Sequence, residues 1–405
     1  MIANRTILFL HQNFPGQFRH LCAALAERNR VLFLTRRTAN RMKGVELVDC
    51  APHRAPDPGI HPYLAGPERA ILQGQATARR LIQLRRDGVR PDLIVGHTGW
   101  GETLFVKDIF PDVPLLGYFE FFYSATGADV GFDPEFPADP EAPFRLRIRN
   151  QAILSALDAC DSGLSPTHWQ HGRLPAVFRP KISVLHDGID TDKVRPAPQG
   201  ALTLPGGLVF DPGVPLVTYV ARNLEPYRGF HIFMRAVRPI LDRNPDARIV
   251  VVGGDEVSYG TRLPGGETYR ERALSETALD TSRVHFVGTL PYASYLSLLQ
   301  ASRAHVYLTY PFVLSWSVLE AMAAGCLVVA SRTAPVEEVI RHGENGLLVD
   351  FFDAEAIAQS VTQALREPGR FDALRHAARR TIVESYDLKR ICLPAQLAFL
   401  EKAIG

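Results

Sequence analysis

Short apolar runs alternate with amphipathic, helix-length segments along most of the chain. The runs that this pattern predicts as strands are 6–11, 31–35, 92–97 and 113–119 in the first half, and 216–221, 247–254, 284–288, 304–309, 326–331 and 346–350 in the second. Such alternation is typical of α/β proteins with parallel sheets. Because the layout occurs twice, we predict two doubly wound domains facing a central cleft.

Proline and glycine indicate where the first domain ends. Nine of the twenty residues in 196–215 are Pro or Gly, a composition typical of linkers. We therefore predict an N-terminal domain over 1–195 and a C-terminal domain over 196–385. The segment 386–405 follows the completed second sheet and carries a last predicted helix.

Charge changes this picture in two segments. The whole chain has a net charge of +2, which gives no sign of a nucleic-acid-binding protein. Residues 1–90, however, hold 15 Arg and Lys against 6 Asp and Glu, an excess of +9. This excess indicates either a solvated basic face, or contact with an anionic membrane surface or acidic acceptor. Residues 124–143 carry five acids and no base, and we expect a surface loop or lid there.

Cysteine spacing and hydropathy restrict the class further. The five cysteines are scattered without a CxxC pair, so neither a metal site nor a disulfide framework is expected. No uninterrupted apolar span of membrane length occurs, and the first apolar run is too short for a signal peptide. We expect a cytoplasmic protein.

Three loops that follow predicted strands carry candidate ligand-binding residues, because ligands of doubly wound sheets bind beyond the carboxyl ends of strands. In "HQNFPGQF", Gly16 would let the backbone approach a phosphate, although turns need glycine anyway. In "ARNLEPYRG", Arg222 and Arg228 could converge on one anion or be merely solvated. In "GHTGWGE", His97 ends a strand and is either an active-site or a structural histidine.

The stretch "YPFVLSWSVLEAMAAGC" (310–326) contains one carboxylate, Glu320, in an apolar surrounding. Ser317 and Glu320 have the spacing of a helix capping box, in which Glu320 would accept from the N-cap amide. Alternatively, the N–H groups of Trp316, Ser317 and Val318 form an anion site at the helix start, and Glu320 accepts both hydroxyls of a ribose.

Several other motifs are absent or out of context. Asp190-Thr-Asp192 is a DxD sequence, but it lies near the domain junction without the strand pattern that such a metal site needs, so we expect no metal. No GxGxxG follows a predicted strand, which argues against a dinucleotide oxidoreductase. Neither a GxxxxGK[ST] phosphate loop nor a GxSxG nucleophile elbow occurs.

The loops, taken in order, resemble the GT-B glycosyltransferases, and specifically the retaining family 4. The resemblance rests on the glycine loop, "ARNLEPYRG", "VHFVGTL", "LEAMAAG" and "APVEEVIRHGENGLLV". It covers most of the chain and is more specific in the second half. The combination of "HQNFPGQFRHL" with "YPFVLSWSVLEAMAAGC" is similar to the subgroup of exopolysaccharide (galactoglucan-type) biosynthesis enzymes. The resemblance implies two Rossmann-like domains and a C-terminal helix that crosses back to the first domain.

The resemblance also implies roles for individual residues. Arg222 and Arg228 would hold the diphosphate of a nucleotide-sugar donor, with Arg228 where the family usually has lysine. Glu320 would bind the donor ribose, and Leu290 or its backbone neighbours would contact the base. His97 would lie near the transferred sugar, which makes it a catalytic candidate together with the two arginines.

Two positions depart from the family pattern. Gly16 matches only part of a loop that often holds two glycines. Phe312 stands where the family has the first glutamate of its Glu-x7-Glu element, so we expect its ring at the cleft edge beside the donor sugar.

The activity implied by the resemblance is retaining transfer of a hexose from a UDP- or GDP-sugar to a glycan or lipid-linked acceptor in polysaccharide biosynthesis. A double displacement needs two carboxyl groups beside the anomeric carbon, and this region offers one, so front-face transfer without a metal or a further cofactor is expected. Two alternatives remain open: a GT-B-type nucleotide-sugar epimerase, and a catalytically impaired sugar-nucleotide-binding protein.

Overall fold

The computed structural model describes residues 2–197, 200–277 and 279–405. It divides into two compact units, an N-terminal unit of 1–188 and 388–405 and a C-terminal unit of 189–387. Each unit is an α/β domain built on a parallel sheet, as predicted. The description below takes each unit by itself.

The N-terminal unit contains a seven-stranded parallel sheet in the order β3-β2-β1-β4-β5-β6-β7. The order β3-β2-β1-β4 is that of a doubly wound sheet: the strands are added on one side of β1 as far as β3, and β4 is then added on its other side. The strands are β1 (Thr6–Leu10), β2 (Arg30–Thr35), β3 (Val45–Asp49), β4 (Leu93–His97), β5 (Leu115–Tyr118), β6 (Ser162–Ser165) and β7 (Ile182–Val184). The helices are α1 (Arg19–Leu25), α2 (Ala65–Arg86), α3 (Val106–Ile109), α4 (Ala142–Arg149), α5 (Gln151–Ala159), α6 (His168–Arg173) and α14 (Leu393–Ile404), with short helices η1 (Gly16–Phe18), η2 (Pro62–Leu64), η3 (Arg179–Lys181) and η7 (Leu388–Cys392).

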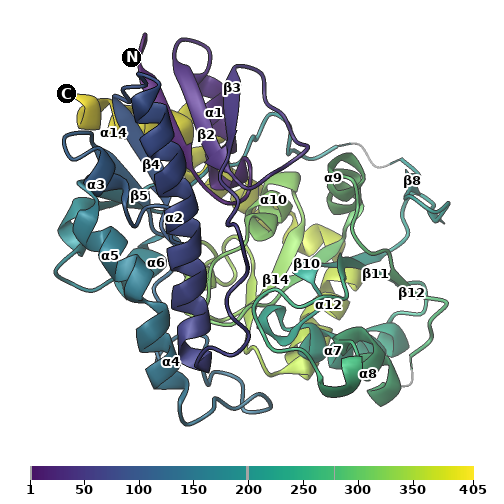
Figure 1. The fold of residues 1–405 in the computed structure, drawn as a ribbon. Helices are drawn as coiled ribbons and strands as arrows, with labels where there is room; N and C mark the ends of the chain where they lie inside the picture. Colours follow the sequence, from purple (N-terminus) through teal and green to yellow (C-terminus); the bar gives the residue numbers. More distant parts are fainter. Residues whose placement is uncertain (1, 198–199, 278) are drawn as a thin grey trace. The chain divides into compact units, whose positions relative to one another are not determined.

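The C-terminal helix belongs to the N-terminal unit. Leu400 of α14 is fully buried in the same apolar cluster as Leu21 and Leu25 of α1. Figure 1 shows α14, at the yellow end of the chain, beside the purple strands of this unit. The predicted return of this helix to the first domain is therefore confirmed. The opposite face of the sheet is covered by α2, α3 and α5.

The C-terminal unit contains a six-stranded parallel sheet in the order β12-β11-β10-β13-β14-β15 and a two-stranded antiparallel hairpin, β8-β9. The strands are β8 (Leu202–Thr203), β9 (Val209–Phe210), β10 (Leu216–Asn223), β11 (Arg248–Gly254), β12 (Val284–Phe286), β13 (Ala304–Tyr307), β14 (Leu327–Ser331) and β15 (Leu347–Val349). The helices are α7 (Phe230–Arg243), α8 (Tyr269–Glu276), α9 (Tyr292–Ala301), α10 (Trp316–Ala324), α11 (Ala334–Glu337), α12 (Ala354–Arg366) and α13 (Asp372–Ser385), with η4 (Pro226–Arg228), η5 (Pro264–Gly266) and η6 (Pro368–Phe371).

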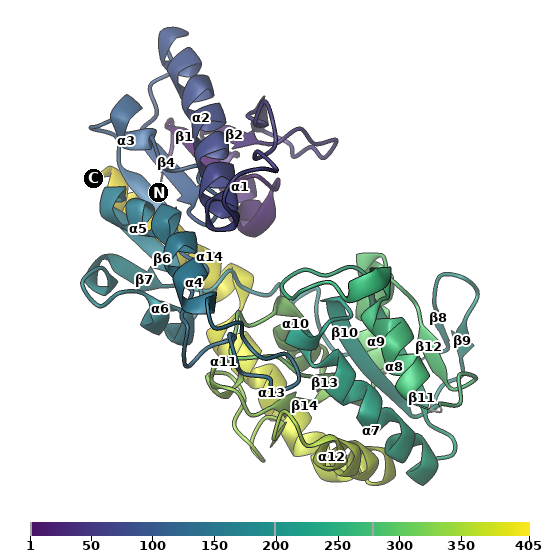
Figure 2. The same cartoon turned by 60° about the horizontal axis from the view of Figure 1, so that its bottom comes forward.

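Two helix layers cover this sheet. Helices α9, α10 and α13 share an apolar cluster with β13 and β14. Helices α7 and α12 pack against each other, and Figure 2 shows them side by side. Because both faces are covered, the central strands are buried on both sides and mostly apolar, with Thr218 and His305 as buried polar exceptions, so their sequences do not alternate.

Two features of the chain differ from the sequence-based expectation. The strand β3 was not predicted, because "VELVD" carries Glu46 and lies at the edge of the sheet, where a strand is only half-buried. The Pro- and Gly-rich stretch 196–215, of which 198–199 lie outside the described residues, is more than a linker. Its hairpin packs Leu202 and Phe210 against Val250 of the C-terminal sheet, and that unit already begins at residue 189. Among the described residues, no helix has the length and hydropathy needed to cross a membrane.

Candidate functional site

The loop after β10 places Arg228 in the interior of the C-terminal unit. Gly229 adopts a left-handed conformation (φ 67°) that ends η4 and starts α7, and a side chain there would approach Leu308 to 2.4 Å. Glu225 is fully buried, and its carboxylate accepts the backbone N–H groups of Ser258 (3.0 Å), Tyr259 (3.1 Å) and Gly260 (2.8 Å). These bonds hold the loops that follow β10 and β11 together at one edge of the sheet.

Arg228 is buried with a relative exposure of 7%. Its Nη1 donates to Thr309 Oγ1 (2.8 Å), the Val313 carbonyl (3.0 Å) and Tyr307 Oη (3.2 Å). Burial acts to lower its pKa, but the surrounding tyrosine hydroxyls outweigh burial and raise it, so the guanidinium is charged. Within the described part of the chain, no Asp or Glu forms an ion pair with it. Its partners are all neutral.

Arg222 differs from Arg228 in its surroundings. It lies near the end of β10 and is exposed. The interpretation of both arginines as merely solvated is wrong for Arg228, because packing buries its side chain. Their convergence on one diphosphate stays a prediction.

Phe312 lies in a cluster of aromatic side chains. Its ring is only 5% exposed and packs against Tyr259 (5.0 Å between centroids) and Tyr227 (5.5 Å). Tyr310 also packs on Tyr227, at 4.8 Å. Aromatic side chains from neighbouring loops therefore cover the ring, and its expected place at the cleft edge stays a prediction. Its role as a neighbour of the donor sugar stays a prediction.

The start of α10 excludes the capping-box alternative for Glu320. The helix begins at Trp316, so its N-cap is Ser315, whose Oγ accepts from the Ser317 N–H at 3.3 Å. Ser317 is thus the second helical residue, and the third is Val318, which cannot complete a capping box. Trp316 is 45% exposed. The Ser317 N–H is already bonded to the N-cap side chain, and the anion site at Trp316, Ser317 and Val318 stays a prediction.

The carboxylate of Glu320 accepts two tyrosine hydroxyls from α9. Tyr292 Oη donates to Oε1 at 2.6 Å, and Tyr295 Oη donates to Oε2 at 2.8 Å. Burial and the Glu320 carboxylate raise the pKa of Tyr295 well above its usual value, so this hydroxyl keeps its proton. Leu290, two residues before Tyr292, is partly buried against the same cluster as α10.

In the N-terminal unit, the glycine loop after β1 is closely packed. Gly16 has φ 52°, and a Cβ at this position would lie 2.7 Å from His11 Nε2. His11 Nδ1 accepts the Asn13 N–H at 2.9 Å, so the ring proton is on Nε2, which donates to Gln17 Oε1 at 2.8 Å. Burial lowers the pKa of His11 to about 3, and His97 contributes. His11 is therefore neutral.

His97 ends β4 as predicted, but its side chain is only 3% exposed. Its Nδ1 accepts the Gly99 N–H at 3.2 Å, and its Nε2 lies 3.6 Å from Glu120 Oε2. Glu120 follows β5, its side chain is 35% exposed, and its Oε1 accepts from Gln17 Nε2 at 2.9 Å. Burial acts to raise the pKa of Glu120, but the hydrogen bonds from His97 and Gln17 outweigh it and lower the pKa.

Glu102 is a second carboxyl group near this loop, and it is buried. Its Oε1 accepts the Gln12 N–H at 2.9 Å, whereas its Oε2 is buried without a hydrogen-bond partner. Burial raises the pKa of Glu102 to about 7, against the opposing effects of its hydrogen bonds and of His97 and Arg36. Glu102 is 1% exposed, and its hydrogen bond with the Gln12 N–H connects it to the glycine loop.

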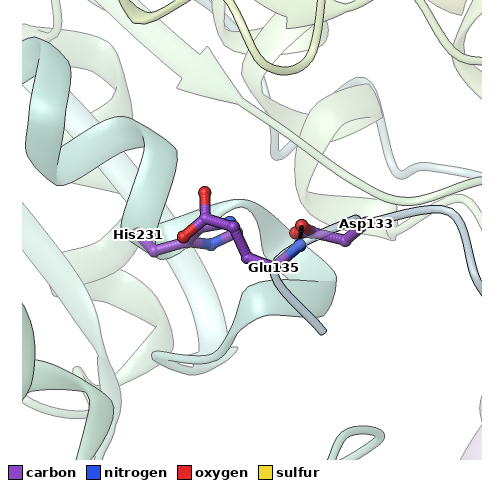
Figure 3. Close-up of side chains that lie close together, drawn as sticks. All are labelled: Asp133, Glu135 and His231. Atoms are coloured by element: carbon purple, nitrogen blue, oxygen red, sulfur yellow. Dashed lines mark hydrogen bonds between the residues drawn. The ribbon is translucent and has the colours of Figure 1, made fainter. Parts of the chain in front are cut away.

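The acidic segment 124–143 forms an irregular loop between β5 and α4. Figure 3 shows Asp133 and Glu135 of this loop, where the Glu135 N–H donates to Asp133 Oδ1 at 2.9 Å. The figure also shows His231, which lies in α7 of the C-terminal unit. The predicted surface loop is observed, and its role as a lid stays a prediction.

Sequence reasoning missed four residues of these constellations: Glu120, Glu225, Tyr292 and Tyr295. Only Glu120 had a usable signal, since an acid two residues after the strand "LLGY" lies at the carboxyl end of the sheet. The other three act through partners from other loops and helices, which no local pattern indicates.

Two family matches together cover most of the chain. Residues 27–194 match the glycosyl transferase family 4 group, and residues 206–381 match the glycosyl transferases group 1. The D-inositol 3-phosphate glycosyltransferase of Rhodococcus jostii is 30% identical over 247 residues, which are 60% of this chain and 52% of that protein. The enzyme of the same name from Corynebacterium urealyticum is 29% identical over 213 residues, 49% and 47% of the two chains. The chain thus spans about half the length of the curated relatives it matches.

Solved structures share the fold over the whole chain. HepE of Anabaena in complex with UDP and glucose has a TM-score of 0.66 and 17% identity, covering 99% of this chain and 100% of that one. Sucrose-phosphate synthase of Thermosynechococcus elongatus has a TM-score of 0.72 and 18% identity, covering 98% and 99%. At this identity the likeness concerns the fold alone.

Proposed function

We propose that the chain is a retaining hexosyltransferase of the GT-B class, because residues 27–194 match the glycosyl transferase family 4 group and residues 206–381 match the glycosyl transferases group 1. In this proposal it moves a hexose from a nucleotide-diphosphate sugar to a glycan, glycolipid or lipid-linked acceptor in polysaccharide biosynthesis. The likeness of its loops to the galactoglucan-type subgroup supports that acceptor class. Other relatives are D-inositol 3-phosphate glycosyltransferases, so a phosphorylated polyol belongs among the acceptors to be tested.

The buried, unpaired charge of Arg228 is the observation that carries the proposal. A buried charge without a counter-ion costs several kcal/mol, and proteins avoid it unless a ligand supplies the opposite charge. The three neutral acceptors on Nη1 hold the guanidinium in one orientation but leave its charge uncompensated. A diphosphate offers both the charge and the bidentate geometry that a guanidinium prefers.

The remaining donor contacts follow from the C-terminal unit. Glu320, whose carboxylate lies at the α9–α10 contact, accepts the ribose hydroxyls, and Leu290 contacts the base. The N–H groups at the start of α10 contribute to phosphate binding. The donor is a UDP- or GDP-sugar; the binding of UDP-glucose in HepE supports a uridine nucleotide.

In the reaction, the leaving diphosphate gains negative charge as the glycosidic bond breaks. Arg222, Arg228 and the first turn of α10 stabilise that charge, which is the role a metal has in other transferases. The diphosphate oxygen takes the proton of the acceptor hydroxyl on the same face of the sugar. We propose no metal and no cofactor besides the donor, and transfer should therefore persist in EDTA.

Calorimetry with UDP and GDP, both in EDTA, tests the donor site. The wild type should bind one of them, and Arg228→Met should lower that affinity by about tenfold to a hundredfold, since a charge-assisted hydrogen bond contributes about 1.5–3 kcal/mol. Arg341→Met is the matched control, because the Arg341 side chain is 78% exposed and its ion pair among the described residues is with Glu344. Equal affinities of wild type and Arg228→Met would refute the proposed donor site.

Product analysis separates the proposal from its alternatives. Incubation with the donor alone should give slow hydrolysis to the free hexose and the nucleoside diphosphate. Release of the epimeric sugar would identify an epimerase. Tight nucleotide binding with neither hydrolysis nor transfer would identify a catalytically impaired binding protein. Phe312→Glu would then be the first variant to assay for transfer.

A further inference from the structure

The half-exposed carboxylate of Glu120 is the feature of the N-terminal unit that the donor site does not explain. Two groups fix it in place. Gln17 donates to Oε1 at 2.9 Å, and His97 Nε2 lies 3.6 Å from Oε2. The amide orientation of Gln17 is itself determined, because its oxygen accepts from His11 Nε2. The Glu120 carbonyl oxygen also accepts from the side-chain amide of Gln170, which holds the backbone at this position.

His97 is poorly placed to contact a substrate directly. Its side chain is 3% exposed, and both ring nitrogens have partners in the same unit, Gly99 at Nδ1 and Glu120 at Nε2. The acceptor role of Nδ1 requires the proton on Nε2, which points that proton toward Glu120. Glu120, with a side chain that is 35% exposed, is therefore the member of this pair that a ligand can reach.

An exposed aromatic ring adjoins the pair. Trp100 is 39% exposed, and its ring is stacked on that of His97 with 6.3 Å between centroids and an interplanar angle of 21°. An exposed indole offers a flat apolar surface that can pack on the C–H face of a pyranose, while a nearby carboxylate accepts hydrogen bonds from its hydroxyls. Both come from loops at the carboxyl ends of neighbouring strands, β4 and β5.

We propose that Glu120 and Trp100 form a binding site for a neutral pyranose, with Glu120 as the carboxylate that contacts its hydroxyls and His97 and Gln17 as positioning residues. The inference deepens the proposed function, on which it rests, by assigning a sugar ring to the acceptor and naming the residues that bind it. The part of the pyranose that faces Glu120 carries no phosphate, because the ionised carboxylate would repel it and the neighbouring His11 is neutral and offers no positive charge.

Saturation-transfer NMR of the full chain with methyl α-D-glucopyranoside tests the site. The wild type should give saturation transfer to the sugar, and Glu120→Gln and Trp100→Ala should each raise the apparent Kd by about tenfold or more, the loss expected for one charge-assisted bond or one aromatic contact face. Glu46→Gln, a change of the same kind at an exposed carboxylate paired with Arg30, should leave binding unchanged. No transfer to the wild type, or an unchanged Kd in Glu120→Gln, would overturn the proposal.

The positioning role of His97 has a separate readout. The Gln side chain can still donate a hydrogen bond toward Glu120, so His97→Gln should retain most of the binding, whereas His97→Leu should lose it. Thermal unfolding of both variants shows that they are folded. Equal losses in both variants would overturn the positioning role.

Failure of this site and failure of the donor site are distinguishable, because calorimetry with UDP and GDP on the same preparation reports only the donor site. Nucleotide binding without glucoside binding would refute the pyranose site alone. Glucoside binding without nucleotide binding would refute the proposed donor site and leave the sugar contact standing.

Discussion

Replacing Glu320 by glutamine separates a ligand-binding carboxylate from one that only holds α9 against α10. The carboxylate accepts Tyr292 Oη at 2.6 Å and Tyr295 Oη at 2.8 Å. Glutamine keeps one oxygen acceptor, and its amide nitrogen faces the other tyrosine, whose hydroxyl must rotate to accept. Two charge-assisted bonds thus become two neutral bonds.

The magnitude follows from the exposure of the two hydroxyls. Hydrogen bonds to charged groups contribute about 1.5–3 kcal/mol and neutral ones about 0.5–1.5 kcal/mol, so each replacement costs about 1 kcal/mol. Tyr295 is 8% exposed and should contribute fully, whereas Tyr292 is 41% exposed and should contribute less because solvent competes. We expect the free energy of unfolding to fall by about 1–2 kcal/mol.

Nucleotide affinity is the decisive measurement. If Glu320 accepts two ribose hydroxyls, Glu320→Gln should weaken binding of the preferred nucleoside diphosphate by about tenfold or more in calorimetry, because one charged acceptor pair is lost. Tyr295→Phe is the matched comparison: it removes one donor and a similar amount of stability, measured by urea unfolding, but it keeps the charged oxygens. It should therefore cost less affinity than Glu320→Gln. Equal affinities in wild type and Glu320→Gln would refute the ribose contact and leave Glu320 as a structural partner of the tyrosines.

Three further predictions concern the N-terminal unit. Gly16→Ala should lower the free energy of unfolding by about 1–3 kcal/mol, because φ is 52° and the new Cβ would lie 2.7 Å from His11 Nε2; an unchanged thermal midpoint would contradict this. Burial raises the pKa of Glu102 from 4.5 to about 7, so the stabilisation that the protonated Glu102 gives the folded state is complete below pH 4.5 and is lost, by about 3 kcal/mol, as pH rises to 7. Glu102→Gln should remove this loss in urea titrations at pH 5 and pH 8. An identical pH dependence of wild type and variant would contradict the assignment. The +9 excess of residues 1–90 should give co-sedimentation with anionic liposomes that weakens as salt rises, and binding insensitive to both lipid charge and salt would remove its basis.

The sequence by itself determined the architecture. The predicted strands of both halves are observed within a few residues, and the last helix packs on the first unit. These predictions succeed because hydrophobic periodicity and strand-end glycines are local signals, and because a sheet covered on both faces demands uninterrupted apolar strands. The same locality explains why the position of His97 at the end of β4 and that of Arg228 in the loop after β10 could be predicted.

Only the tertiary structure decided what the polar side chains touch. Glu320 lies 25 residues from Tyr295 in sequence, and Gln17 lies 103 residues from Glu120, so neither pair can be inferred from spacing. Packing likewise covered Phe312 with aromatic rings from other loops. The physical reason is common to all of them: a hydrogen bond or ring contact depends on which helices and loops become neighbours when the sheet assembles, and no local stretch of the chain determines that arrangement.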